Sequence, residues 1–185
     1  MKKIILIAAA AIVSASAFAQ PKFAHVNMNE LVQLMPEMDA ARATMDASGK
    51  EAQETYQAMV AEFQTKYQQY EQKAATMSQA IREAKEKELT DLQQRIQEFQ
   101  QTIQQELGTQ QQALMAPIAE KAQNTVNDLA KAGGYVYVFD VAGLLYYDAT
   151  QSTDLTPEAR KALGIPEDRT LESLAAELQA AQQAE

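Results

Sequence analysis

The chain has 185 residues and no cysteine, with 25 acidic residues against 16 basic ones and a formal charge of −9. This acidity argues against nucleic acid as a partner, because affinity for a phosphate backbone depends on neutralisation by lysine and arginine. Without cysteine the chain can form neither a disulfide nor a cysteine-containing zinc cluster. Its fold must therefore depend on packing or on oligomerisation.

The N-terminal segment, residues 1–19, predicts a secretory signal peptide. Lys2 and Lys3 precede an apolar run over residues 4–13, and a small-residue A-x-A cleavage motif ends at Ala19. A transmembrane anchor is the alternative, but a membrane span needs about 20 apolar residues. We expect cleavage after Ala19 and no stable membrane anchor. Removal of the two lysines reduces the 16 basic residues to 14 against 25 acidic ones, which changes the formal charge from −9 to −11.

A short strand and two helix starts follow the cleavage site. Residues 22–27 alternate polar and apolar side chains, which is typical of a strand. A helix can begin near Asn29. Pro36 predicts a second helix start, because proline fits the first helical turn and disfavours helical geometry at Met35.

A long helical segment comes next, with no proline between Glu37 and Gly108. Its apolar residues recur every three or four positions and predict an apolar stripe on one helix face: Tyr56, Met59, Phe63, Tyr67, Tyr70, Ala74 and Met77. One straight helix over residues 37–131 would be about 140 Å long at 1.5 Å per residue. We therefore expect an antiparallel helical hairpin over residues 36–131, the arm, with its tip at residues 74–79.

Ten glutamines between Gln93 and Gln112 also permit a disordered tract. The helical spacing of Leu92, Ile96 and Phe99 favours a coiled-coil-like helix instead. These residues begin a second apolar stripe, which continues past Pro117. Pro117 predicts a local bend there, because proline removes a backbone hydrogen bond.

The β-rich part of the chain follows Gly133-Gly134, which predicts the end of the helix. Residues 135–139 are aromatic or β-branched and residues 144–147 are leucine and tyrosine, and together they predict a hairpin of two strands. Both faces of this hairpin are apolar, and an isolated hairpin is marginal in water. Identical subunits supplying further strands are the simplest solution, and the residues that we assign to subunit contacts are Val26, Val136, Val138, Phe139, Leu144 and Tyr146.

The fold class is therefore mainly α, with a small β body formed by residues 20–35 and 132–165. Thr156-Pro157-Glu158 predicts the start of a short helix, and Gly164 its end. Residues 166–185 form a C-terminal extension with three leucines on one helix face. This extension either docks on the body or forms a loosely held acidic tail.

No catalytic, cofactor-binding or metal-binding residues are predicted. His25 is the only histidine, and no glycine-rich phosphate loop or nucleophile elbow occurs. The segment "DATQSTD", residues 148–154, lacks the central glycine and terminal glutamate of a calcium-binding EF-hand loop. We therefore expect a protein that is not an enzyme and needs no cofactor.

Four stretches, taken in order, carry a family resemblance: "FAHVNMNELVQLMPE", "MSQAIREAKEKELTDLQQRIQEFQQ", "LMAPIAEKAQNTVNDLAKAGGYVYVFD" and "DLTPEARKALGI". With the signal peptide, they resemble the Skp/OmpH family of periplasmic chaperones as far as about Ile165. The resemblance implies a homotrimer, with a strand-swapped trimeric β-barrel body and three projecting arms around a cavity. It further implies ATP-independent holding of unfolded outer-membrane proteins in the periplasm, where the chaperone prevents their aggregation.

The arm carries the residues that we assign to client contacts: Tyr56, Met59, Phe63, Tyr67, Tyr70 and Met77. Methionine is adaptable and tyrosine amphipathic, so both suit varied clients. The alternative is that these residues only pack the two helices of one arm together. An alternative for the whole chain is a coiled-coil structural spacer or assembly factor of the cell envelope. Unlike the basic members of the family, this chain is acidic, and the charges near its predicted arm tip cancel.

Overall fold

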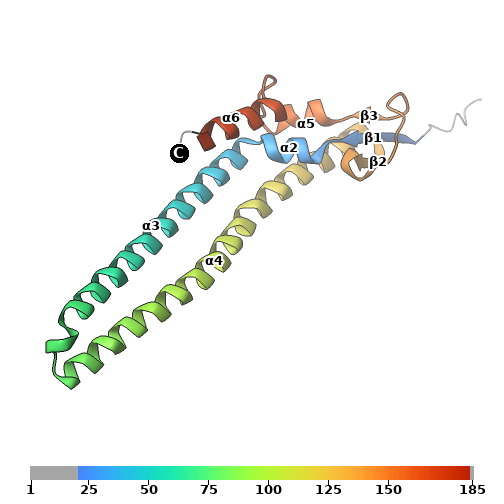
Figure 1. Cartoon of the computed structure of the whole chain (residues 1–185). Coiled ribbons are helices and arrows are strands. Elements are labelled where there is room, and N and C mark those ends of the chain that lie inside the picture. Colours follow the sequence, from blue (N-terminus) through green and yellow to red (C-terminus); the bar gives the residue numbers. More distant parts are fainter. Residues whose placement is uncertain (1–20, 184–185) are drawn as a thin grey trace, which may run out of the picture.

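The computed structural model describes residues 21–183, so the predicted signal peptide lies outside the described residues. A long helical hairpin projects from a smaller body that contains a short sheet (Figure 1). The elements, in chain order, are β1 (Lys22–Val26), α2 (Met28–Leu34), α3 (Pro36–Lys73), a 3₁₀ turn η1 (Ala74–Thr76), α4 (Gln79–Gly133), β2 (Tyr135–Asp140), a 3₁₀ turn η2 (Val141–Gly143), β3 (Thr153–Asp154), α5 (Thr156–Ala162) and α6 (Leu171–Gln183). The chain is thus mainly helical with a small sheet, as predicted.

The arm consists of α3 and α4, which run antiparallel and meet at η1. This reversal lies in the segment where the sequence predicts it. The Ser78 side chain accepts a hydrogen bond from the backbone N–H of Ile81 and so caps α4. At the other end of α3, Met35 has an extended ψ of 140° and Pro36 takes the first helical turn. A backbone elbow at Met35 therefore separates the arm helix α3 from the body helix α2.

The sheet differs from the predicted hairpin. Its order is β2-β1-β3, and β1 pairs in parallel with both neighbours. After β2, the Asp140 carboxylate accepts a hydrogen bond from the N–H of Ala142 at 3.2 Å and starts η2, which turns the chain away from the sheet. Residues 144–147 therefore form no strand, and the prediction of a strand there is wrong. β1 pairs with one edge of β2, β3 pairs with the far edge of β1, and the outer edge of β2 has no neighbouring strand among the described residues.

The core lies where the arm joins the body. It brings together side chains from six helices and strands, among them Val26, Leu31, Leu34, Met38, Ile118, Val126, Ala159, Leu163 and Leu174. In the arm beyond Ala41, by contrast, Leu92 is the only buried hydrophobic residue between positions 42 and 117 of the described chain. The arm is therefore a thin two-helix structure that exposes most of its surface.

Within residues 21–183, no helix combines the length and the apolar character that crossing a bilayer requires.

Candidate functional site

An apolar surface covers one face of the small sheet. The rings of Phe23 and Tyr137 stack at a centroid distance of 6.2 Å, and Tyr137 stacks on Phe139 at 6.0 Å. Tyr137 is 59% exposed and Phe139 41% exposed, while Leu145 and Tyr146 project from the following loop. We call these five residues the aromatic face. The three stacked rings form a contiguous exposed apolar surface of the kind that marks an interaction site.

The predicted subunit contacts do not all lie on this surface. Phe139 and Tyr146 belong to the aromatic face, and Val136 is exposed on the opposite side of β2. Val138 is partly buried against the core, and Leu144 is half-buried. Val26 is 2% exposed inside the chain's own core, so it is not accessible to a second subunit. The structure removes Val26 from the candidate surface.

Three residues of the aromatic face, Phe23, Tyr137 and Leu145, are absent from the predicted set. The alternation along β2 places Tyr137 on the same face as Phe139, and this signal could have found it. Phe23 could not be found in this way, because the parallel pairing of β1 with β2 joins residues more than a hundred positions apart.

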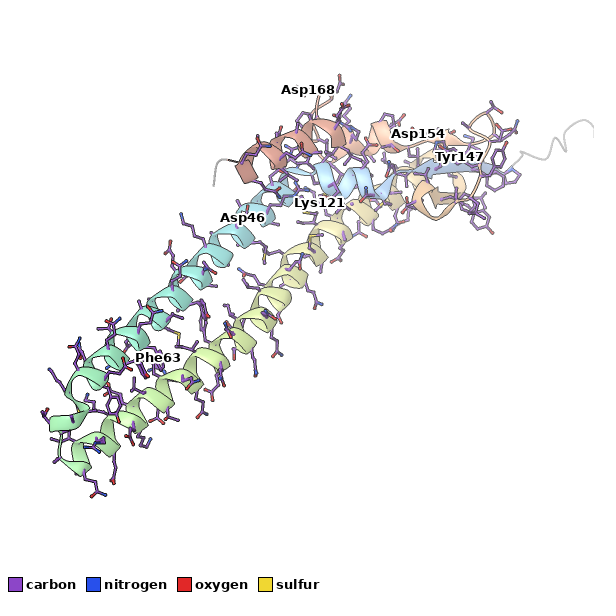
Figure 2. The ribbon with its side chains drawn as sticks, in the orientation of Figure 1. Asp46, Phe63, Lys121, Tyr147, Asp154 and Asp168 are labelled. Carbon is purple, nitrogen blue, oxygen red and sulfur yellow. The ribbon has the colours of Figure 1, made fainter. Side chains whose placement is uncertain are left out.

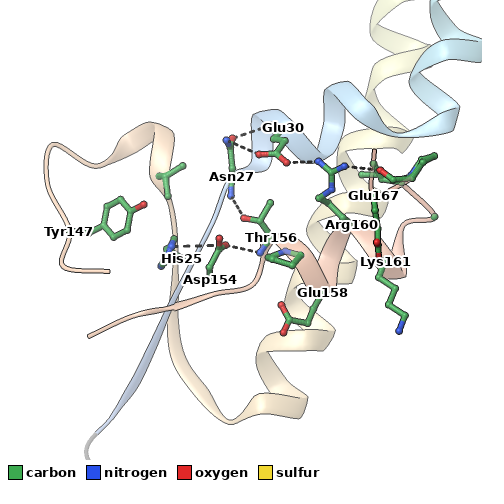
Figure 3. A pocket seen from close by; sticks show the side chains of 15 residues that line it. His25, Asn27, Glu30, Tyr147, Asp154, Thr156, Glu158, Arg160, Lys161 and Glu167 are labelled. Carbon is green, nitrogen blue, oxygen red and sulfur yellow. Dashed lines mark hydrogen bonds and ion pairs between the residues drawn. The ribbon is translucent and has the colours of Figure 1, made fainter. Parts of the chain in front are cut away.

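The buried histidine has a structural role. His25 is 6% exposed; its Nδ1 lies 2.9 Å from the Ser152 hydroxyl, its Nε2 lies 4.0 Å from Asp154, and its ring packs on Tyr147 (Figure 3). These contacts hold the loop after η2 against β1. An open pocket of about 950 Å³ lies beside the histidine and continues to α5. No group of three or more potential metal ligands occurs among residues 21–183.

The predicted client-contacting residues line the inner seam of the arm. Tyr56, Met59, Phe63, Tyr70 and Met77 are half-buried, whereas Tyr67 is exposed. Phe63 and Tyr67 stack at 6.1 Å, and Figure 2 shows Phe63 on the side of α3 that faces α4. Most of these side chains therefore pack the two helices together while a part of each stays accessible to solvent.

The charges near the arm tip are paired across the two helices. Glu88 of α4 accepts hydrogen bonds from Lys66 of α3 and from Lys85, the latter at 2.7 Å. The hydrogen bond from Lys66, and after it the one from Lys85, lowers the pKa of Glu88 to about 2. The Lys66–Glu88 hydrogen bond also raises the pKa of Lys66. The Tyr70 hydroxyl donates to Glu86, which raises the pKa of Tyr70. The opposite charges neutralise one another, so this part of the arm is not a free positive patch.

Comparison with known proteins identifies the family of this two-helix arm on a small sheet. Residues 22–163 match the family described as "Outer membrane protein (OmpH-like)". The chain is 27% identical over 149 residues to the chaperone protein Skp of Yersinia enterocolitica, a match that covers 80% of this chain and 90% of that protein. The chain belongs to the OmpH-like family, which confirms the resemblance to the Skp/OmpH periplasmic chaperones.

A solved structure supports the fold independently. The crystal structure of an OmpH-like outer membrane chaperone from Caulobacter crescentus superposes with a TM-score of 0.69 and covers 78% of this chain and 85% of its own. The two sequences are 14% identical, so this likeness concerns the fold alone.

Proposed function

We propose that this chain is an ATP-independent periplasmic holdase, which binds unfolded outer-membrane proteins between helical arms and prevents their aggregation. The observation that carries the proposal is the thin arm: between positions 42 and 117 of the described chain, Leu92 is the only hydrophobic residue that is buried. An arm with so little core cannot be a compact domain, and its long surface is suited to contact with another polypeptide. Membership of a chaperone family supports the same function.

Assembly into a homotrimer is the second part of the proposal. The aromatic face is too apolar to remain in water, and the outer edge of β2 has unpaired backbone groups. Three copies joined through these surfaces, with Val136, Val138, Phe139, Leu144 and Tyr146 at or near the contacts, would bury both features. The arms would then project from one body and surround a cavity.

Client holding in this arrangement depends on many weak and adaptable contacts. Tyr67 and the accessible parts of Tyr56, Met59, Phe63, Tyr70 and Met77 offer aromatic and thioether surface to an unfolded chain. None of these contacts requires a nucleotide or a cofactor. Since the chain is acidic and the tip charges are paired, attraction by positive charge contributes less than in the basic members of the family.

Export and processing complete the proposal, with the signal peptide removed after Ala19 and the mature chain released in the periplasm. The competing function is a coiled-coil spacer or assembly factor of the cell envelope that binds one folded partner.

Aggregation of a denatured outer-membrane β-barrel protein separates these two functions. A holdase at one trimer per client suppresses the light scattering that follows dilution from urea, without added nucleotide. A folded soluble enzyme diluted with the same trimer serves as the control, because its scattering should not change. Unchanged aggregation of the barrel protein would favour the spacer.

A further inference from the structure

The C-terminal extension lies outside the family match, which ends at residue 163, yet it packs closely on this chain. Leu174 of α6 is 6% exposed within the core, and α6 lies alongside α2 (Figure 1). The Thr170 and Ser173 side chains each accept a hydrogen bond from the backbone N–H of the other at 3.0 Å, which caps α6 at its first turn. The extension is therefore an ordered part of the body.

Two arginines connect this C-terminal region to both sides of the elbow at Met35. Arg169 Nη2 lies 2.6 Å from Asp39 Oδ1 in the first turn of α3, on the arm side of the elbow. Arg160 Nη1 lies 2.6 Å from Glu30 Oε1 of α2, on the body side (Figure 3). Arg160 also donates to the carbonyl oxygen of Arg169 at 2.5 Å, so the two ion pairs are linked through the backbone of the extension.

The extension contacts α3 beside the break between the two helices. The extended ψ of 140° at Met35 interrupts the helical hydrogen bonding between α2 and α3. Within the chain's own elbow, Arg42 of α3 donates to the backbone carbonyl and the side-chain oxygen of Gln33 in α2, at 3.0 and 2.6 Å. The second arm helix, α4, continues into the body as one helix, with Pro117 inside it. Restraint of the elbow therefore restrains the angle of α3 and, through the packing of the hairpin, the angle of the arm.

We propose that residues 166–183 are a brace that fixes the angle between the arm and the body. Arg169 and Leu174 are its two points of attachment, the first to α3 and the second to the core beside α2. The brace goes beyond the holding of clients: it sets how far the arm swings whether or not a client is bound.

The experiment measures a distance between arm and body in the full mature chain without client. The sequence has no cysteine, so Gln69→Cys on the exposed face of α3 and Glu158→Cys on α5 allow two spin labels at chosen positions. Labelled chains are diluted with unlabelled ones, and the interspin distance distribution is recorded for the otherwise unchanged chain and for R169Q and L174A. The matched control is L178A, which truncates an exposed leucine of the same helix.

A narrow distribution is expected for the parent chain and for L178A, and a broader one for R169Q and L174A. Hydrogen exchange should show the cause: in L174A the amides of residues 28–45 exchange roughly tenfold faster or more, while those of the sheet and of residues 56–90 keep their protection. Distance distributions in R169Q and L174A that superpose on that of the parent would overturn the brace. Exchange that rises equally over the whole chain would also overturn it, since the extension would then only stabilise the fold in general.

Discussion

Lys66 on α3 and Glu88 on α4 form an ion pair across the two helices of the arm. Nearer the body, the Ser48 hydroxyl accepts a hydrogen bond from Gln110 at 3.0 Å. These pairs define which residues of the two helices face one another in a region with little buried apolar surface. These polar contacts add to the half-buried apolar seam in aligning the two helices.

The first prediction concerns the pH dependence of the arm tip. The pKa of Glu88 is lowered from 4.5 to about 2, so its pairing stabilises the folded arm above pH 4.5 and this contribution is lost as the pH falls towards 2. E88Q should therefore speed amide exchange at residues 62–92 at pH 7, and the difference from the parent should shrink below pH 4.5. Lys87→Met, which removes an exposed ion pair with Asp91 on one helix, is the control. A difference for E88Q that is the same at pH 7 and pH 3 would contradict the assignment.

A second prediction concerns assembly. Tyr137→Asp places a charge on the aromatic face. Tyr137 is 59% exposed in the single chain, so the chain itself should still fold. Burial of an unpaired charge between subunits is costly, and the variant should sediment as a monomer at concentrations where the parent is a trimer. Gln64→Asp on the exposed face of the arm should leave the trimer intact. Val138→Asp is a poorer test, since Val138 packs partly on the core and its substitution also destabilises the single chain.

A third prediction concerns two glycines inside the arm helices. A Cβ atom at Gly49 or Gly108 would meet nothing within 4 Å, and both positions are helical. Replacing either with alanine should therefore stabilise the arm by roughly 0.5–1 kcal/mol, measured as the free energy of unfolding in urea. Gly134→Ala should act in the opposite direction, because Gly134 ends α4 with a φ of 67° that alanine adopts only with strain. Equal effects at all three positions would contradict this explanation.

A fourth prediction concerns the joint between arm and body. Leu34 is fully buried in the core cluster, and Leu34→Ala should lower the free energy of unfolding by about 2–5 kcal/mol through the cavity that it leaves. Leu178→Ala on the exposed side of α6 should change it little. Urea unfolding followed by circular dichroism checks both, and a small effect at Leu34 would show that the cluster does not carry the stability of the body.

The sequence predicted the elements that depend on local signals. Pro36 starts α3, Ser78 caps α4 after the turn, and the alternation after residue 21 becomes β1. Each of these features is determined within a few residues of the chain, by a fixed φ, a capping hydroxyl or a two-residue period.

Long-range features were predicted poorly. The β propensity of residues 144–147 predicts a strand, but η2 turns the chain away from the sheet after β2, and the outer edge of β2 stays without a neighbouring strand among the described residues. The sequence did not decide whether the extension docks on the body, because Arg169 and its partner Asp39 are 130 residues apart and no local pattern links them. Val26 was assigned to a subunit contact because alternation identifies an apolar face without telling which surface covers it.

Shortening the arm tests whether clients bind to the arm and not to the body. Deletion of residues 60–95, with a short glycine-serine linker between facing positions of α3 and α4, should leave an assembled body that no longer suppresses aggregation. Tyr67→Ala should weaken holding with little effect on the arm, because Tyr67 is 44% exposed, whereas Phe63→Ala should destabilise the seam. Full holding by the shortened chain would show that the arm does not bind clients.

Sedimentation velocity of the mature chain, alone and with an unfolded outer-membrane β-barrel protein, measures assembly and client binding in one experiment. A trimeric holdase has the mass of three chains in the absence of client and the mass of three chains plus one client after mixing, with no nucleotide present. A monomer at micromolar concentration, or a trimer whose mass does not change while the client aggregates beside it, would rule out a trimeric holdase.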